Sequence, residues 1–233
     1  MGHIAFAYLS SKASGSLLKT KFNIPLILTL SVIPDIDILF SNQHLQLLEH
    51  RGPTHSVITA LLVFTPFFMI YRKRAVPYFI ALVQHSLVGD YIAGGKTQLL
   101  WPITAQYFGL PIDIRSSTNV TIEWTMFLAS MIIMLKSKDV STFFRRQKSN
   151  LILIIPTSTV LLPPFLSYPL DVPAWLIPPH IFYIAIFSAA ILIELPHVLK
   201  PAENRSKIPT SAIIKCYDGA GGLLPRTTDR SRF

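Results

Sequence analysis

Eight consecutive residues, Glu49-His50-Arg51-Gly52-Pro53-Thr54-His55-Ser56, stand directly before an apolar run that begins at Val57. Imidazole is the commonest protein ligand for transition metals, and guanidinium is well shaped to grip a phosphate or a carboxylate. The pair Gly52-Pro53 predicts a turn, because proline fixes its own backbone and pushes the preceding residue out of the helical region. The two histidines therefore need not obey helical spacing, and Thr54 is the expected N-cap of the following helix.

The composition of the whole chain indicates an integral membrane protein. Of its 233 residues, 51% are hydrophobic and 14% are charged, whereas about a quarter of the residues in soluble domains carry charge. The net charge of +9 does not indicate a nucleic-acid partner, because the Lys and Arg residues lie in short blocks between apolar runs. The single cysteine, Cys216, excludes an internal disulfide and a cysteine-rich zinc site. The stretch 49–56 then has two interpretations, a ligand-bearing turn or a polar helix start at a membrane surface.

The apolar runs predict an all-α fold, a polytopic transmembrane bundle of about six to seven helices. A weakly apolar first segment predicts a tilted or half-buried helix with His3 at its mouth, and residues 94–118, with Leu99-Leu100-Trp101-Pro102, predict a lid or re-entrant segment. The expected helical segments are 4–18, 24–40, 57–71, 75–93, 120–135, 151–166 and 181–199. The expected domains are a metal-site membrane domain with an outer loop (1–118), C-terminal transmembrane helices (119–200) and a flexible basic tail (201–233).

The distribution of positive charge predicts how these segments cross the membrane. If Arg72-Lys73-Arg74 is a cytoplasmic loop, the opposite side receives only Arg51, Lys96 and Arg115 before the tail. This positive-inside pattern predicts a multi-pass protein of the plasma (inner) membrane. Most acidic and histidine residues near the spans then collect at one extracytoplasmic rim, with His85 about a turn and a half deeper: His3, Asp35, Asp37, His50, His55 and Asp90.

These residues form a nitrogen and oxygen ligand set that suits a divalent metal, zinc first and manganese or ferrous iron as alternatives. Ionisable groups within spans are costly and tend to mark function. His85 and Asp90 are five residues apart, which is off-face in an α-helix, and a single π turn would bring them together. Asp35 and Asp37 can point the same way at a helix end opened by Pro34. There are more candidates than one tetrahedral ion needs, so a second ion or carboxylates that orient the imidazoles are both open.

Five features occur in a characteristic order along the first half: Gly2-His3, Pro34-Asp35-Ile36-Asp37, His50-Arg51-Gly52-x-Thr54-His55-Ser56, the segment with His85 and Asp90, and Leu99-Leu100-Trp101-Pro102. Over roughly residues 1–110 this pattern resembles the membrane-bound metal-dependent hydrolase family typified by YdjM. More remotely, the His and Asp pattern is similar to zinc-dependent phospholipases C and related nucleases. The family pattern sets the histidine four places before the aspartate, where this chain has Ser86, so that His85 stands one place early.

The resemblance implies an integral membrane metal-dependent hydrolase that cleaves a phosphodiester, in a phospholipid or a lipid-linked substrate, at the outer membrane face. Arg51 would share the charge that develops on a phosphoryl oxygen, and a carboxylate that binds no metal would accept the proton of the attacking water. Membrane lipids and a small amphipathic substrate are the expected partners, and the oligomeric state is left open. The expected metal ligands are His3, Asp35, Asp37, His50, His55, His85 and Asp90, and the expected catalytic residues are Arg51, Asp37 and His50.

Two other function classes share the same ligands. A metal transporter should carry ionisable groups at the midplane of several spans and show internal repeats, but the later spans are almost free of charge. A non-enzymatic metal-binding membrane protein would use the ion only to hold short helices together. This last class predicts that removal of the metal unfolds the outer half of the protein.

Overall fold

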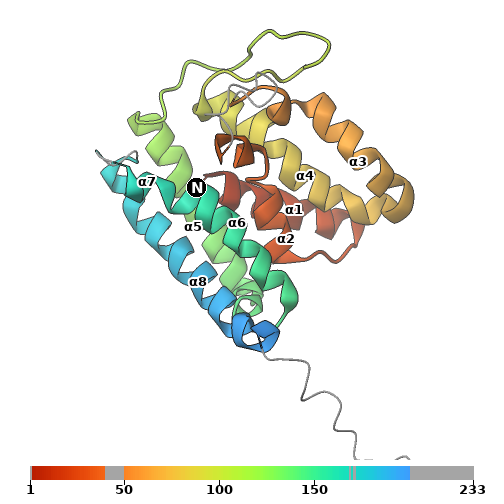
Figure 1. Cartoon of the computed structure of the whole chain (residues 1–233), viewed down its shortest axis with the longest axis vertical. Helices are drawn as coiled ribbons and strands as arrows, with labels where there is room; N and C mark the ends of the chain where they lie inside the picture. Colours follow the sequence, from red (N-terminus) through yellow and green to blue (C-terminus); the bar gives the residue numbers. More distant parts are fainter. Residues whose placement is uncertain (1, 40–49, 168, 170–171, 200–233) are drawn as a thin grey trace, which may run out of the picture. The chain divides into compact units, whose positions relative to one another are not determined.

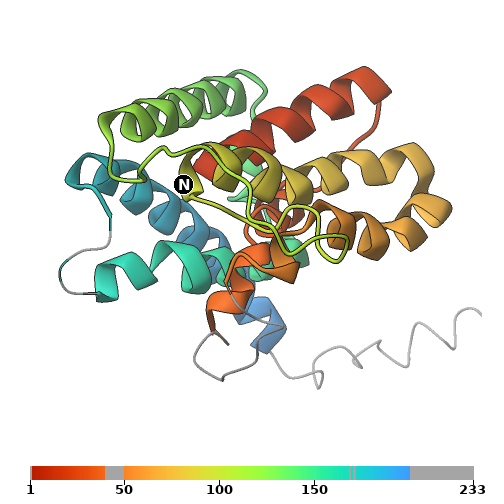
Figure 2. The same cartoon turned by 90° about the horizontal axis from the view of Figure 1, so that it is seen from above.

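The computed structural model describes residues 2–39, 50–167, 169 and 172–199, and within these ranges the chain is mostly helical and has no strand (Figures 1 and 2). The chain divides into two units, Met1–Leu195 and Pro196–Phe233, and the site described below belongs to the first. The expected basic tail, 201–233, and Glu49 lie outside the described residues. The expected division near residue 118 stays a prediction.

The N-terminal helix α1 (Gly2–Leu18) contributes to the main apolar core of the first unit. It packs against α4 (Val76–Gln84) on one side and α5 (Ser117–Lys136) on the other (Figure 2). Ile4 and Tyr8 are fully buried in these contacts and belong to the main apolar core. The half-buried helix expected at 4–18 is therefore present, and its first turn carries His3 into the interior of the unit.

The expected single helix over 24–40 is wrong. The helix α2 (Ile24–Leu30) begins at the N-cap Asn23, whose side-chain oxygen accepts a hydrogen bond from Leu26 N, and it ends after seven residues. A short turn leads to Pro34, which has no N–H to continue a helical hydrogen-bond ladder. The chain resumes as the 3-10 helix η1 (Pro34–Leu39), which carries Asp35 and Asp37.

A helical hairpin follows, and its second helix leads into the segment that carries His85 and Asp90. The helix α3 (Val57–Tyr71) matches the predicted range, and the 3-10 turn η5 (Arg72–Ala75) leads back into α4. Phe79 of α4 packs against Phe68 of α3 with ring centroids 5.2 Å apart. At Gln84 the α-helix widens into a π-helix, η6 (His85–Gly94).

The C-terminal half covers α1 and α2 from the other side (Figure 1). The apolar run expected as one helix at 151–166 is continuously helical from Lys148 to Leu161, with 3-10, α and π turns in succession, and a further short helix follows at 163–166. Phe127 of α5 and Phe187 of α8 contribute the large buried rings of the core. The elements after α5 are η7 (Asp139–Thr142), η8 (Lys148–Leu153), α6 (Ile154–Pro156), η9 (Thr157–Leu161), α7 (Pro163–Leu166), η10 (Ala174–Leu176) and α8 (Ile177–Leu199).

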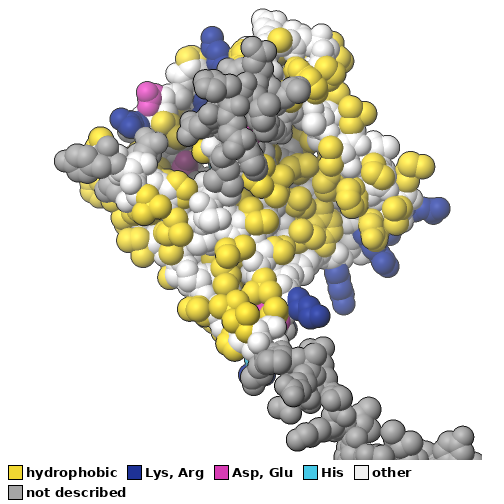
Figure 3. Space-filling view, viewed as in Figure 1, with side chains coloured by type: hydrophobic (Ala, Val, Ile, Leu, Met, Phe, Trp, Pro, Cys, Tyr) yellow, Lys and Arg dark blue, Asp and Glu magenta, His cyan; other side chains and the backbone are white. Residues whose placement is uncertain are grey.

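Two helical segments of the described chain are long and apolar enough to cross a membrane, Ser117–Lys136 and Ala174–Leu199. The predicted bundle of six to seven spans is thus not confirmed, although the fold is helical. Large apolar side chains stay exposed on several helices, for example Leu62 on α3, Ile132 on α5 and Leu192 on α8. Figure 3 shows one face of the molecule, on which hydrophobic side chains cover much of the described surface. Monomeric soluble proteins rarely expose such large apolar patches, and these surfaces suit contact with lipid.

Candidate metal centre

The seven residues expected as metal ligands lie in one cluster of mutual contacts, although they come from four separate segments. His3 is in the first turn of α1, and Asp35 and Asp37 are on η1. His50 and His55 bracket the turn that contains η4 (Pro53–His55). The π-helix η6 supplies the last two, His85 and Asp90. The local reason is the same in each case: every one of these residues lies at a helix end or in a non-α segment, where the backbone can turn toward a shared point.

Four side-chain atoms converge at the middle of the cluster. Asp35 Oδ1 lies 3.2 Å from His85 Nε2 and 3.4 Å from His55 Nε2. Asp90 Oδ2 lies 3.4 Å from the same two nitrogens. The side chains of His55 and His85 are fully buried, and neither their Nε2 atoms nor Asp90 Oδ2 has a hydrogen-bond partner in the described chain. Buried polar atoms are normally paired, so this arrangement fits an ion that they coordinate.

The remaining nitrogens of the two buried imidazoles fix which ring atom faces the centre. His85 Nδ1 donates to the backbone carbonyl of Ser31 at 2.6 Å, which leaves the lone pair on Nε2. His55 Nδ1 lies 3.3 Å from Asp37 Oδ2 and 2.9 Å from Thr54 Oγ1. An imidazole that donates its other N–H to a carbonyl or carboxylate is oriented for metal binding and made more basic.

Asp37 acts as the hub of this supporting shell. Its side chain is fully buried and accepts hydrogen bonds from Thr54 Oγ1 at 2.6 Å and from His50 Nδ1 at 2.9 Å, in addition to its contact with His55. Burial alone would raise the pKa of this carboxyl group, but the hydrogen bonds from His50, His55 and Thr54 hold the pKa well below its usual range. The carboxylate therefore stays ionised and holds one imidazole with each oxygen.

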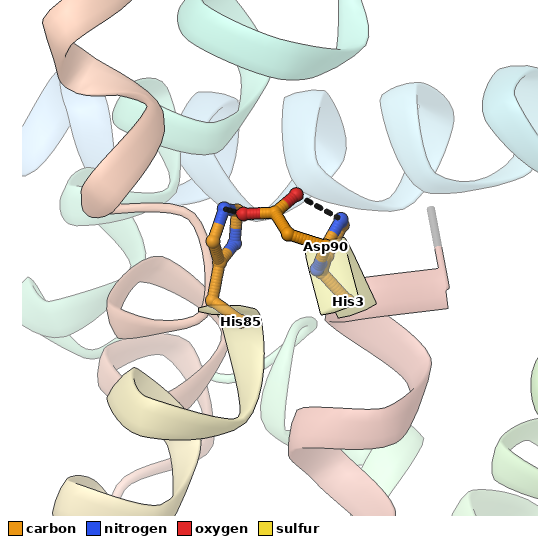
Figure 4. Close-up of side chains that lie close together, drawn as sticks. All are labelled: His3, His85 and Asp90. Carbon is orange, nitrogen blue, oxygen red and sulfur yellow. Dashed lines mark ion pairs between the residues drawn. The ribbon is translucent and has the colours of Figure 1, made fainter. Parts of the chain in front are cut away.

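The π-helix brings His85 and Asp90 together across a spacing of five residues, as the π turn predicted from the sequence requires. Ser86, the next residue, is also buried, but it is the His85 ring that faces Asp90 Oδ2. Figure 4 shows His85 and His3 on either side of the Asp90 carboxylate. The His3 ring stacks on His85 with centroids 4.1 Å apart, and its Nε2 lies 4.0 Å from Asp90 Oδ1.

Two subsets of the cluster have the geometry to hold an ion each. His3, His85 and Asp90 form one, and Asp35, His50 and His55 form the other, with ligand atoms within 4.8 Å of one another inside each subset. Asp37 belongs to neither subset, which agrees with its supporting position. The residues thus leave room for one central ion or for two neighbouring ions.

Arg51 connects the cluster to the following loop. Its backbone is in the left-handed region at φ 68°, and its carbonyl accepts hydrogen bonds from Gln98 N at 3.0 Å and from Thr97 Oγ1 at 3.3 Å. Its guanidinium lies so close to Gly95 that a Cβ there would stand 2.4 Å from Nη1. The expected contact of Arg51 with a substrate anion stays a prediction.

The expected N-cap Thr54 is wrong. Ser56 caps α3, because its Oγ accepts hydrogen bonds from the backbone N–H groups of Ile58 and Thr59. The same hydroxyl lies 2.6 Å from the carbonyl oxygen of Trp101 and so ties the loop to the helix start. The Thr54 hydroxyl is instead directed to Asp37.

Sequence reasoning missed three parts of the site: the Ser31 carbonyl, the Thr54 hydroxyl and Gly89. A Cβ at position 89 would stand 2.1 Å from the His3 ring, so the close approach of this imidazole requires glycine. Thr54 adjoins His55 and offered a signal, since a hydroxyl next to a ligand often orients it. The role of the Ser31 carbonyl could not be predicted, because every residue has a backbone carbonyl and the pattern of side chains does not distinguish one from another.

Fold and site together define a helical protein with a buried histidine and aspartate centre that fits a divalent metal ion. A family model described as the YdjM inner membrane protein matches residues 1–162, which include the whole cluster. The chain belongs to this family of inner membrane proteins, and the resemblance inferred from its motifs is confirmed. No curated protein and no solved structure matches the chain.

Proposed function

We propose that this protein is a metal-dependent hydrolase that cleaves a phosphodiester in a phospholipid or lipid-linked substrate at the outer face of the inner membrane. The observation that carries the proposal is the convergence of two buried imidazole nitrogens and two carboxylate oxygens, with each nitrogen 3.2 to 3.4 Å from each oxygen. Three of these four atoms have no hydrogen-bond partner in the described chain. The Nδ1 atom of each imidazole contacts an oxygen outside the centre, the Ser31 carbonyl for His85 and the Asp37 carboxylate for His55. Ligands with supporting hydrogen bonds on their far side are the usual design of a metal centre.

The residues that would hold the ion are His55, His85, Asp35 and Asp90, with His3 and His50 at the two ends of the cluster. This nitrogen and oxygen set suits zinc, and it also suits manganese or ferrous iron. A divalent ion bound here would supply Lewis-acid chemistry and lower the pKa of a coordinated water.

The chain's own residues supply proton transfer and charge stabilisation. The His50 side chain is 34% exposed, whereas His55 and His85 are fully buried, so His50 is the imidazole that reaches outward toward a substrate. Asp37 holds its Nδ1–H, so in the one-ion arrangement, in which His50 binds no metal, Nε2 can accept a proton from an attacking water. Arg51 adjoins His50 in the chain and would share the charge that develops on a phosphoryl oxygen.

The surroundings of the centre support an amphipathic substrate. The loop after η6 is tied to the start of α3 through Ser56 and exposes apolar side chains, among them Leu100 and Ile103, the latter 80% exposed. Exposed apolar side chains next to a polar centre suit a molecule with a charged head and an apolar tail. Phospholipids and lipid-linked phosphodiesters have this character and are available to an inner membrane protein.

Turnover tests the proposal. Wild-type protein, His55→Ala and His197→Ala would be purified in detergent, and the release of water-soluble phosphate-bearing products from vesicles of total membrane lipid would be measured. Wild type should release products, lose this activity on stringent chelation and regain it with zinc or manganese. His55→Ala should be inactive, while His197→Ala, a histidine outside the cluster, should match wild type. Activity that survives stringent chelation would remove the proposal.

A second candidate is a non-enzymatic protein in which the ion joins segments of the fold. The favouring observation is that the cluster connects four separate segments, α1, η1, the turn of η4 and η6. In that case chelation should lower the thermal unfolding temperature strongly, and no lipid product should appear under any metal. A metal transporter has less support, because the two helices able to cross a membrane, α5 and α8, contribute none of the seven residues.

A further inference from the structure

An apolar cavity of about 110 Å³ adjoins the metal centre in the first unit. Four helical elements, α1, the end of α4, η6 and α5, form its walls together with the end of the loop that precedes α5. Its apolar lining comes from Phe6, Val88, Ile92, Ile114, Ile122 and Met126. The lining also includes the polar side chains of His3, Gln84, Asn119 and Glu123, so the cavity offers mainly apolar walls together with a few polar groups.

The cavity and the cluster share residues. His3 and Gly89 line the cavity, and the same His3 ring stacks on His85 and faces Asp90 in the cluster. A molecule whose apolar part fills the cavity would therefore carry its next polar group to the His3 end of the metal centre. The His3 ring lies directly against the backbone of Gly89, where a Cβ would stand 2.1 Å from the ring.

The position of the cavity along α5 fits the chain region of a bilayer. Asn119 and Met126 both line it, and they are about 10 Å apart along a helix that rises 1.5 Å per residue. This helix is one of the two that are long and apolar enough to cross a membrane. Asn119 Nδ2 also donates to the carbonyl of Ile114 at 2.6 Å, which fixes the end of the loop over the cavity.

We infer that the cavity binds a short segment of one acyl chain of the lipid whose phosphodiester lies at the metal centre. The inference rests on the proposed function and narrows its substrate class to lipids with a chain attached close to the phosphate. Water-soluble phosphodiesters lack the group that the cavity accommodates. Recognition then divides between two places, with the charged head at the His and Asp cluster and the chain against Val88, Ile122 and Met126.

Photo-crosslinking tests this inference without any need for turnover. The full-length protein would be reconstituted in nanodiscs that contain a phosphatidylethanolamine with a diazirine in one acyl chain, irradiated, digested and analysed by mass spectrometry. We expect labels concentrated on cavity residues such as Phe6 and Met126. Ile122→Trp, which fills the cavity, should reduce these labels at least fivefold, and Val88→Phe should do the same from the opposite wall.

Leu128→Trp is the matched control, because Leu128 is on the same helix, is 50% exposed and does not line the cavity. It should leave the cavity labels unchanged. Labels spread over the outward faces of the helices and insensitive to Ile122→Trp and Val88→Phe would overturn the inference. Hydrolysis without cavity labelling would remove only the acyl-chain site, whereas cavity labelling without hydrolysis would remove only the proposed reaction.

Discussion

At the scale of single residues, the centre is built in two layers whose members have similar side chains but different tasks. Asp35 and Asp90 present oxygens to the imidazole Nε2 atoms, whereas Asp37 contacts Nδ1 atoms and a hydroxyl. The sequence offered Asp35 and Asp37 as equivalent carboxylates. The 3-10 geometry of η1 and the hydrogen bond from Thr54 to Asp37 distinguish the two carboxylates. Residue type alone predicts neither feature.

Replacement of the hub carboxylate should weaken metal binding without abolishing it. Asp37→Asn keeps the size of the side chain but can no longer accept from both His50 and His55 with charged oxygens. Loss of a supporting carboxylate typically costs 10- to 100-fold in metal affinity. Competition with a chromophoric zinc chelator measures this change, with Asp139→Asn as a control far from the cluster in sequence and contacts. Unchanged affinity would contradict the hub role, and complete loss of metal would make Asp37 a ligand.

Gly89 is the residue at which the smallest substitution should have a large effect. In Gly89→Ala the new Cβ would stand 2.1 Å from the His3 ring, so the imidazole must leave its place between η6 and the cavity. Overpacking of this kind costs about 1 to 3 kcal/mol, and His3 should no longer support the bound ion. Thermal unfolding and zinc affinity, measured side by side, report both effects.

The matched control is Gly2→Ala, because a Cβ at position 2 would meet Glu123 Cγ at 3.4 Å, an ordinary contact. This variant should behave as wild type in both measurements. If Gly89→Ala retains wild-type stability and zinc affinity, then the close approach of His3 has no role in the centre.

At the scale of elements, the π-helix η6 accounts for the departure from the family pattern. A histidine four residues before an aspartate suits an α-helix, and this chain has a five-residue spacing in a π-helix instead. The wider turn returns the histidine to the same face as the aspartate. The five-residue spacing predicted a π turn from the sequence, and η6 confirms it.

Moving the histidine by one place should thus break the centre rather than repair it. In the double variant His85→Ser with Ser86→His, the imidazole starts from a position that does not face Asp90 in η6. We expect at least a tenfold loss of zinc affinity with the protein still purified as a single species. Wild-type affinity in this variant would show that η6 converts readily to an α-helix and that its π geometry does not position the site.

Elements differ in how well the sequence predicts them, for physical reasons. The range of α3 matches because Ser56 and Arg72-Lys73-Arg74 bound an uninterrupted apolar run. The run at 24–40 looked similar, but Pro34 and two aspartates divided it between α2 and η1. Proline alone does not decide where a helix ends, since α3 continues through Pro66, and hydropathy does not show that α2 stops at Leu30, before Pro34.

At the scale of the whole molecule, the chain places its chemistry in segments that are too short or too irregular to cross a bilayer by themselves. The seven clustered residues precede residue 91, and the two helices able to cross a membrane follow residue 116. The meeting of His and Asp residues could be expected from their common rim in the charge topology. The acyl-chain cavity could not, because ordinary apolar residues from α1, η6 and α5 create it only when these elements pack.

Residues distant in the chain are proposed to share a divalent ion, and the metal content of the purified protein measures that ion directly. Elemental analysis of wild type beside His85→Ala, purified without added metal and without chelator, gives the number of ions per chain. We expect at least one zinc, manganese or iron ion per wild-type chain and a loss of at least tenfold in His85→Ala. Metal at background level in wild type, or equal metal in both proteins, would contradict it.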